Sequence, residues 1–318
     1  MTTNATPPPP GPAHEFMLNM GRKLPMPMRR GIVSLMNWRN SWYTPPAMWR
    51  TRYSRPLWFM VNRHYGNSAR IVELEGELTG YKVKLPTKMV NYWRAANGVI
   101  DPEVPKLIRE TVQRDWTVVD VGAHLGFTAL LLADCVGENG SVVSFEPVPN
   151  NFQTLNFNVE LNNCHNITTV QAAASDCTGH TEMQIDTKIF SMVSSLVQSR
   201  SIALPNPQQV ETHALDDYFE SNGLQDPDFV KIDVEGGEGL VLSGMTRILN
   251  RSQPKILVEI HNSPVFVGTT SIKAFGVLKS AGYSVYRIGK SGELDEMDMG
   301  KPLPEERFQC LAVYGGKA

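Results

Sequence analysis

Acidic residues and glycines lie together in a pattern that could hold a cofactor. The mostly apolar residues 117–121 run into Asp-Val-Gly-Ala-His-Leu-Gly, which contains Asp120, Gly122 and Gly126. Glycines in a turn between a strand and a helix let the backbone approach a ligand closely, and the helix that follows offers unpaired N–H groups. Tight packing of strand against helix is the alternative explanation for these glycines.

A second acidic residue supports a nucleoside site. Glu146 stands 24 residues beyond Gly122, at the end of the next apolar segment in the run Phe-Glu-Pro. A carboxylate at that place in an α/β fold is positioned to accept hydrogen bonds from ribose hydroxyls. The alternative is that Glu146 caps the helix expected to begin near Asn151.

The glycine spacing and the charge favour S-adenosylmethionine over a dinucleotide. Dinucleotide sites use Gly-x-Gly-x-x-Gly, whereas His124 stands here where the second glycine of that pattern would fall. Asp120 would repel a pyrophosphate but attract the sulfonium and ammonium groups of S-adenosylmethionine. We therefore expect that cofactor and no NAD.

A group of charged residues near the middle of the chain could act on a second substrate. Lys231, Asp233 and Glu235 alternate at the end of an apolar segment, and Glu259 and His261 alternate at the end of the next. Alternate residues of a strand share a face. Asp233 could orient or deprotonate a hydroxyl, and His261, with a pKa expected near neutral, could act as general base.

Structural roles for the same residues remain open. Lys231 and Asp233 could form a buried salt bridge, since buried charges are costly unless they are paired. His261 could be a hydrogen-bonded core histidine. Asp233, Glu235, Glu259 and His261 could also gather a divalent cation such as magnesium; the sequence prediction assigns no metal.

The elements that must position these residues alternate between strand and helix from Trp116 onward. Strands alternating with helices predict a parallel, doubly wound α/β sheet with right-handed crossovers and helices on both faces. The expected strands are 117–121, 142–145, 167–173, 229–234, 256–260, 283–288 and 310–314. The expected helices run from Gly126 through Val136 and over 151–161, 215–221, 239–249 and 271–281. A polar segment, 177–209, interrupts the alternation.

Five sequence blocks in this order resemble the FkbM-type methyltransferases. The resemblance covers residues 95–290 and includes Asp-Val-Gly-Ala-His-Leu-Gly-Phe-Thr and Phe-Glu-Pro, then Ala-Ala-Ala-Ser-Asp-x-x-Gly at 172–179, Val-Lys-Ile-Asp-Val-Glu-Gly-Gly-Glu at 230–238 and Leu-Val-Glu-Ile-His at 257–261. It implies a class I, Rossmann-like methyltransferase sheet of seven mostly parallel strands, ordered 3-2-1-4-5-7-6 with the seventh antiparallel. The implied reaction is O-methylation of a hydroxyl, often on a sugar or natural product.

The resemblance also implies roles for individual residues. Asp120, Gly122 and Gly126 would hold the methionine end of the cofactor and Glu146 its ribose. Ser175 and Asp176, with Ala174, would flank the adenine, although Asp176 could equally be a turn residue before Gly179. His124 departs from the asparagine common in the family, which could change contacts to the methionine group. Asp233, Glu259 and His261 are the expected catalytic residues.

The first 70 residues differ in composition from the rest. They hold ten Lys or Arg and one acid, a charge of about +9, so that the remaining chain carries about −11 of the net −2. This segment is Pro-rich and then basic and Trp-rich, and a hairpin and helix over 71–115 lead into the domain at 116–318. The arm could pack against the acidic body or a sister subunit, lie on an anionic membrane surface, or bind nucleic acid.

Composition and segment length indicate a cytoplasmic protein. No apolar stretch is long enough for a membrane span, and no signal-peptide pattern is present. The four cysteines are widely spaced, which does not favour a disulfide framework or a zinc site. Two other functions stay open: a nucleic-acid methyltransferase, disfavoured by the acidic domain, and a catalytically silent cofactor-binding or interaction protein, disfavoured by the intact acidic residues.

Overall fold

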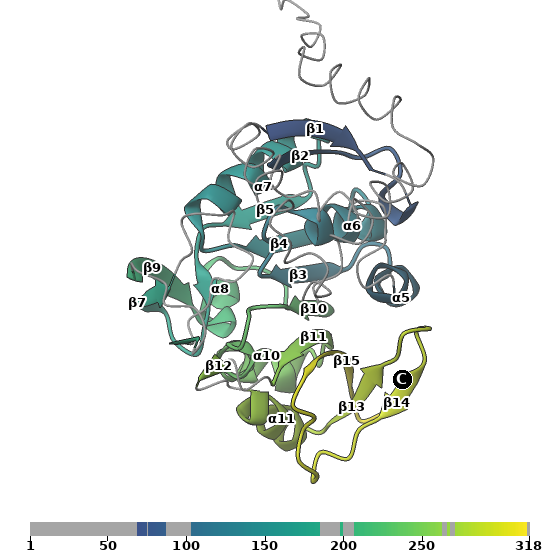
Figure 1. The fold of residues 1–318 in the computed structure, drawn as a ribbon, viewed down its shortest axis with the longest axis vertical. Coiled ribbons are helices and arrows are strands. Elements are labelled where there is room, and N and C mark those ends of the chain that lie inside the picture. The colour runs from purple at the N-terminus through teal and green to yellow at the C-terminus, as the bar shows by residue number, and fades with distance from the viewer. Residues whose placement is uncertain are drawn as a thin grey trace, which may run out of the picture. The chain divides into compact units, whose positions relative to one another are not determined.

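A computed structural model describes residues 69–74, 76–86, 103–184, 198–199, 207–262, 266–267 and 271–316 (Figure 1). These residues belong to one compact unit that extends from Asn67 to Ala318. The predicted basic arm over 1–70 lies outside the described residues except for its last two. The roles proposed for that arm therefore stay predictions.

A central sheet of eight strands organises the domain (Figure 1). From one edge to the other its strands are β5 (Ile167–Val170), β4 (Ser141–Phe145), β3 (Thr117–Val121), β10 (Phe229–Ile232), β11 (Lys255–His261), β15 (Arg307–Tyr314), β13 (Tyr283–Ile288) and β14 (Leu294–Glu296). The first five are parallel to one another, and β15 is antiparallel to both of its neighbours. This confirms the predicted order 3-2-1-4-5-7-6 and the class I methyltransferase fold.

The predicted number of seven strands is wrong by one. The extra strand, β14, pairs antiparallel with β13 and adds a short edge to the sheet. Its three residues, Leu-Asp-Glu, include two acids and have no apolar alternation. Such a strand forms because a turn returns the chain along β13, and its residues carry no strand pattern of their own.

Two hydrophobic layers cover the sheet, because its strands are apolar on both faces. On one face, Val118 and Phe229 pack with residues of α5 (Glu103–Thr111) and α6 (Phe127–Val136), and with Val83 of the hairpin β1 (Ala69–Glu73) and β2 (Lys82–Pro86). The turn of that hairpin contains the 3-10 helix η2 (Gly76–Leu78). On the other face, Val119 and Ile232 pack with α8 (Leu215–Ser221), α9 (Glu238–Ser243), α10 (Thr246–Arg251) and α11 (Ser271–Ser280).

The elements around the third strand differ from the prediction. The strand ends at Val170, and β6 (Ala173–Ala174) joins a separate sheet with β9 (Pro207–His213) and β7 (Gly179–Gln184), which occupies part of the predicted polar segment. A second small sheet pairs β8 (Gln198–Ser199) with β12 (Phe266–Val267). Helix α7 (Pro149–Leu161) begins two residues before the predicted Asn151.

The single helix predicted over 239–249 is two short helices, α9 and α10. Gly244 separates them, and a Cβ at this position would lie 1.9 Å from the carbonyl oxygen of Ser175. Beyond the break, the Asp216 carboxylate accepts the N–H groups of Arg247 and Ile248 at 2.8 and 2.9 Å, in the first turn of α10. The break thus lets the Ser175 backbone pack against the helical layer.

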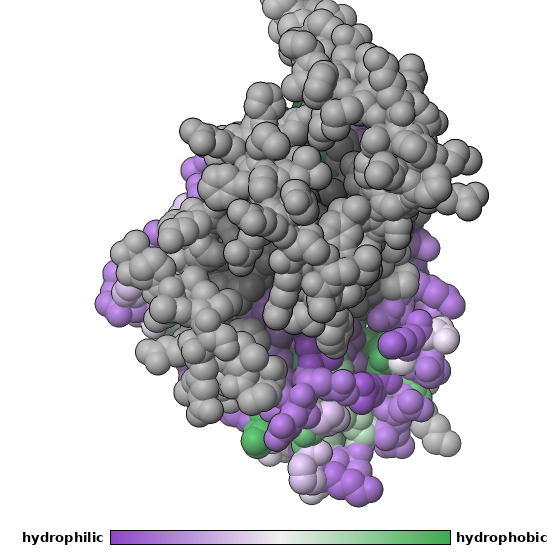
Figure 2. All heavy atoms as spheres, viewed as in Figure 1, coloured by the Kyte–Doolittle hydropathy of each residue, from purple (hydrophilic) through white to green (hydrophobic). Residues whose placement is uncertain are grey.

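The described surface is mostly polar. In Figure 2, hydrophilic residues dominate the described part of the visible face, and hydrophobic atoms are scattered among them. The large hydrophobic side chains that are exposed among the described residues come from different elements; they are Ile71, Leu224, Ile272 and Tyr314. No described helix has the length and hydrophobicity needed to cross a membrane.

Candidate active site

The glycine loop after β3 lies against the end of β10. Gly122 has a left-handed φ of 82°. A Cβ built on Gly122 would lie 2.0 Å from the carbonyl oxygen of Asp233. The N–H groups of Gly122 and Ala123 both donate to the carbonyl of Phe145 at 3.0 Å. The glycine is therefore required for packing, as the alternative interpretation held, and that packing places the predicted cofactor loop directly beside Asp233.

Glu146 connects the end of β4 to the same loop. Its carboxylate accepts the backbone N–H of His124 at 2.8 Å, the N–H of Val148 at 2.9 Å and the Asn151 amide at 3.3 Å. Burial raises the pKa of Glu146 to about 7, against the lowering effect of these donors. The bond to Val148 lies directly before α7, which has no side-chain cap hydrogen bond, and the bond to His124 links Glu146 to the glycine loop.

His124 adopts a left-handed backbone conformation, with φ 52°. Asparagine enters this conformation more readily than most other non-glycine residues, and histidine shares part of that tendency. A histidine at the position where the resemblance leads us to expect asparagine is thus compatible with the turn. The turn aims the His124 N–H at Glu146. Gly126 also has a positive φ, 94°, and packs closely on Leu155 of α7.

Lys231 pairs with two carboxylates, one of them fully buried. The register of β10 and β3 pairs Lys231 with Asp120, and the ammonium Nζ lies 3.6 Å from Asp120 Oδ1 and 3.3 Å from Asp233 Oδ2. Asp120 is fully buried, so burial raises its pKa while Lys231 opposes the increase. The Lys231–Asp233 salt bridge, expected as the structural alternative, is present. Lys231 also donates to the Gly122 carbonyl at 3.5 Å, linking the charges to the glycine loop.

His261 is held between carboxylates at the end of β11. Its Nδ1 lies 2.8 Å from Glu238 Oε1, and its Nε2 lies 3.2 Å from Glu235 Oε2 and 3.9 Å from Glu259 Oε1. Burial alone would lower the pKa of His261, but the three carboxylates raise it to about 10. The expectation of a near-neutral imidazole is therefore wrong for this geometry, and His261 is an imidazolium at neutral pH.

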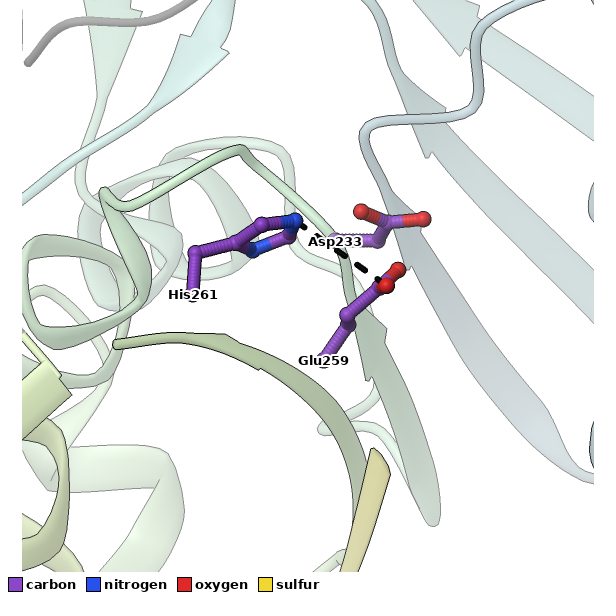
Figure 3. A group of neighbouring side chains, drawn as sticks. All are labelled: Asp233, Glu259 and His261. Atoms are coloured by element: carbon purple, nitrogen blue, oxygen red, sulfur yellow. Dashed lines mark ion pairs between the residues drawn. The ribbon is translucent and has the colours of Figure 1, made fainter. Parts of the chain in front are cut away.

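Asp233, Glu259 and His261 converge in space (Figure 3), with ligand-type atoms within 4.8 Å of one another. Arg307, opposite His261 in the register of β15 and β11, pairs with Glu259 at 2.6 Å. Lys231 pairs with Asp233. Protein cations thus already compensate both carboxylates, and we assign no metal to this cluster.

The pKa values of Asp233 and Glu259 shift in opposite directions. Burial would raise the pKa of Asp233, but Lys231 and His261 lower it to about 2. Burial and the neighbouring Asp233 raise the pKa of Glu259 well above its usual range. The two carboxylates thus differ in the direction of their pKa shifts, which is down for Asp233 and up for Glu259.

Glu238 was not identified as a site residue from sequence, and Glu235 was considered only as part of the charged group and as a possible metal ligand. The predicted strand through Val234 ends at Ile232, and Glu235 has a left-handed φ of 54°, so strand alternation does not give its direction. Glu238 opens α9, is fully buried, and accepts the Gly236 N–H at 2.9 Å. The signal available was the pair of glycines between two glutamates in Glu-Gly-Gly-Glu, which predicts a sharp turn between them.

Ser175 and Asp176 occupy another part of the domain. The backbone of Ser175 donates to the His213 carbonyl at 2.9 Å and packs on Gly244. The exposed Asp176 lies 3.4 Å from Lys273 of α11 and accepts the Ser175 hydroxyl at 3.3 Å. These contacts join the end of β6 to the helical face of the domain, and the proposed adenine contacts stay a prediction.

The sequence of this chain matches a known protein family. The Methyltransferase FkbM domain matches residues 120–285, just over half of the chain. The hexuronic acid methyltransferase AglP of Haloferax volcanii is 26% identical over 186 residues, which are 58% of this chain and 73% of that protein.

Solved methyltransferase structures of lower sequence identity also match the chain. The FkbM methyltransferase of Methylobacillus flagellatus is 18% identical, with a TM-score of 0.39 and coverage of 71% of this chain and 54% of that one. An O-methyltransferase of Bacillus cereus, solved with SAH, is 16% identical, with a TM-score of 0.41 and coverage of 67% and 81%. The fold assignment rests on the strand order described above and not on these two likenesses.

Proposed function

We propose that this chain, which belongs to the FkbM methyltransferase family, transfers the methyl group of S-adenosylmethionine to a hydroxyl of a small molecule or glycan. The observation that carries the proposal is the contact of the Gly122 backbone with the Asp233 carbonyl. It sets the glycine loop against the residue after β10 that belongs to the acidic cluster, and ligands of open α/β sheets bind at the carboxyl ends of the strands.

The cofactor side of the proposal uses residues along the first two strands. Asp120, Gly122, His124 and Gly126 would hold the methionine portion. Glu146 would accept hydrogen bonds from the ribose, because each carboxylate oxygen has two lone pairs and Oε2 receives one backbone donor here. Ser175 and Asp176 would contact the adenine.

The acceptor side uses the acidic cluster. The sulfonium supplies an already activated methyl group, so the chain has to align an acceptor oxygen with it and take up one proton. Asp233, partly exposed beside the glycine loop, would orient the hydroxyl. Glu259 and His261 would line the acceptor site next to Asp233. The activity of the Haloferax relative on a hexuronic acid supports a sugar acceptor.

The test is transfer of a labelled methyl group to defined sugars. Methyl glucuronoside, methyl galacturonoside and methyl glucoside are incubated with labelled S-adenosylmethionine, and the methylated atom is located by NMR. Asp233→Ala and His261→Ala should bind the cofactor normally but transfer about 100-fold more slowly. Glu110→Ala, on the exposed face of α5, is the matched control. Transfer to nitrogen or carbon, or full activity in Asp233→Ala, would contradict the proposal.

A further inference from the structure

Glu235 is held in an unusual conformation at the edge of the acidic cluster. Its φ of 54° is uncommon for a residue with a long side chain. Such residues persist where the surrounding structure holds them, and they concentrate at functional sites. Here the conformation turns the chain after β10 so that Glu235 Oε2 lies 3.2 Å from His261 Nε2 while a quarter of the side chain (26%) stays exposed.

We propose that Glu235 is the proton acceptor of the methyl transfer, and that Glu238 is a positioning residue that holds His261 against it. This inference rests on the proposed O-methylation and names the group that completes it. Glu238 is suited to positioning because its fully buried carboxylate bonds His261 Nδ1 at 2.8 Å and the Gly236 N–H at 2.9 Å. It thereby orients the ring and the turn that carries Glu235.

The other carboxylates of the cluster are less suited to this role. Asp233 is partly exposed, but Lys231 and His261 lower its pKa to about 2, which makes it a weak base. Glu259 is paired with Arg307 and only 5% exposed. Glu238 is completely buried, so a proton placed on it has no direct route to water. Glu235 combines contact with the cluster and contact with solvent, and it can therefore accept a proton and later release it.

The charges that face Glu235 come from every element around it. His261 of β11 and Arg307 of β15 favour its ionised form, whereas Asp233 after β10 and Glu238 of α9 disfavour it. Burial is the largest effect, and the balance raises the pKa of Glu235 to about 7. A group with a pKa near the working pH is the most effective general base.

The proton step balances without another reactant. A lone pair of the acceptor oxygen forms the new O–C bond while the C–S bond breaks, and its electron pair neutralises the sulfonium. The O–H pair stays on the ether oxygen, and the proton passes to the Glu235 carboxylate. Glu235 then releases this proton to water through its exposed edge. His261 keeps its own proton throughout and fixes the carboxylate in place.

Glycine substitution at a left-handed position removes a side chain without destabilising the backbone, so an effect on catalysis can be told apart from an effect on folding. Glu235→Gly removes the carboxylate at a position where glycine is conformationally favoured, so the melting temperature should be unchanged or higher. Gln253→Gly, at φ 53° on an exposed residue before β11, is the matched control and should keep full activity. Transfer to methyl glucuronoside should fall about 100-fold in Glu235→Gly with S-adenosylmethionine affinity unchanged.

A second measurement needs no acceptor. In NMR titrations of the wild-type protein, the Glu235 carboxyl should titrate near pH 7, and the His261 ring should stay doubly protonated through pH 8. Glu238→Gln should lower the pKa of His261 and shift the pH profile of transfer, an effect that a purely structural glutamate would not produce.

The outcomes distinguish this proposal from the proposed function. O-methylation that continues at the wild-type rate in Glu235→Gly, or a Glu235 carboxyl that titrates near 4.5, would overturn the role of Glu235 alone. Methylation of an atom other than oxygen would overturn the proposed function while leaving the NMR titrations as the test of the Glu235–His261 pair.

Discussion

The carbonyl oxygen of Asp233 occupies the space that a side chain at Gly122 would need, since a Cβ there would lie 2.0 Å away. Through this contact the turn after β3 packs directly against the end of β10. The glycine is thus necessary for packing and for bringing the proposed cofactor loop to the proposed acceptor site. The contact bears out the packing interpretation of this glycine, and its approach to a cofactor stays a prediction.

Gly122→Ala should therefore disrupt both the packing of the domain and the position of the proposed cofactor loop. The clash is with backbone, which cannot rotate away, and φ 82° adds strain. We expect a loss of about 2–4 kcal/mol in the free energy of unfolding, as for other overpacked or strained sites, and weaker cofactor binding. Gly223→Ala has a similar φ, 62°, with nothing near its Cβ, and should show only the smaller strain cost in thermal denaturation. Equal effects at the two positions would contradict the role of the contact.

Lys231→Met should destabilise the domain by about 3–5 kcal/mol, because it leaves Asp120 and Asp233 without their shared cation. Urea denaturation at pH 7 measures this. The triple variant that also carries Asp120→Asn and Asp233→Asn should recover much of the loss, since the uncompensated charges are gone. A triple variant no more stable than Lys231→Met would show that packing of the lysine stem, and not charge, explains the effect.

Most of the sheet could be predicted from the sequence, because buried parallel strands are continuous apolar segments between helices. The direction of Glu235 could not be predicted, since a left-handed φ after Ile232 ends the alternation on which the prediction relied. The pKa of His261 was also predicted wrongly. Its partner Glu238 lies 23 residues earlier, and only the packing of α9 beside β11 brings the two together. The edge strand β14 was not predicted, because it forms by pairing with β13 and its residues have no strand pattern of their own.

Cofactor affinity should depend on pH through Glu146. Its pKa is about 7 in the folded protein, and ribose hydroxyls would donate to the ionised carboxylate. Affinity for S-adenosylmethionine should therefore rise between pH 6 and 8 by about tenfold, the limit set by one proton per site. Glu146→Ala and Glu146→Gln should bind more weakly and lose this dependence in calorimetric titrations. A pH profile unchanged by both substitutions would remove Glu146 from the ribose site.

Stability should also depend on pH through His261. Its pKa rises from an ordinary value near 6.5 to about 10 on folding. The stabilisation is fully present below pH 6.5 and is lost as pH rises towards 10, with a total on the order of a few kcal/mol. The gap in unfolding free energy between wild type and His261→Gln should therefore be larger at pH 6 than at pH 10. A gap that stays constant with pH would mean that His261 is not held as an imidazolium.

The most direct test of the account is calorimetric titration of the full chain with S-adenosylmethionine, S-adenosylhomocysteine and NAD. The glycine loop should bind the first two at micromolar concentration and give no heat with NAD, because His124 stands where the second glycine of a dinucleotide-binding loop would fall. Binding of NAD, or the absence of binding by both S-adenosyl compounds, would contradict the assignment of this site.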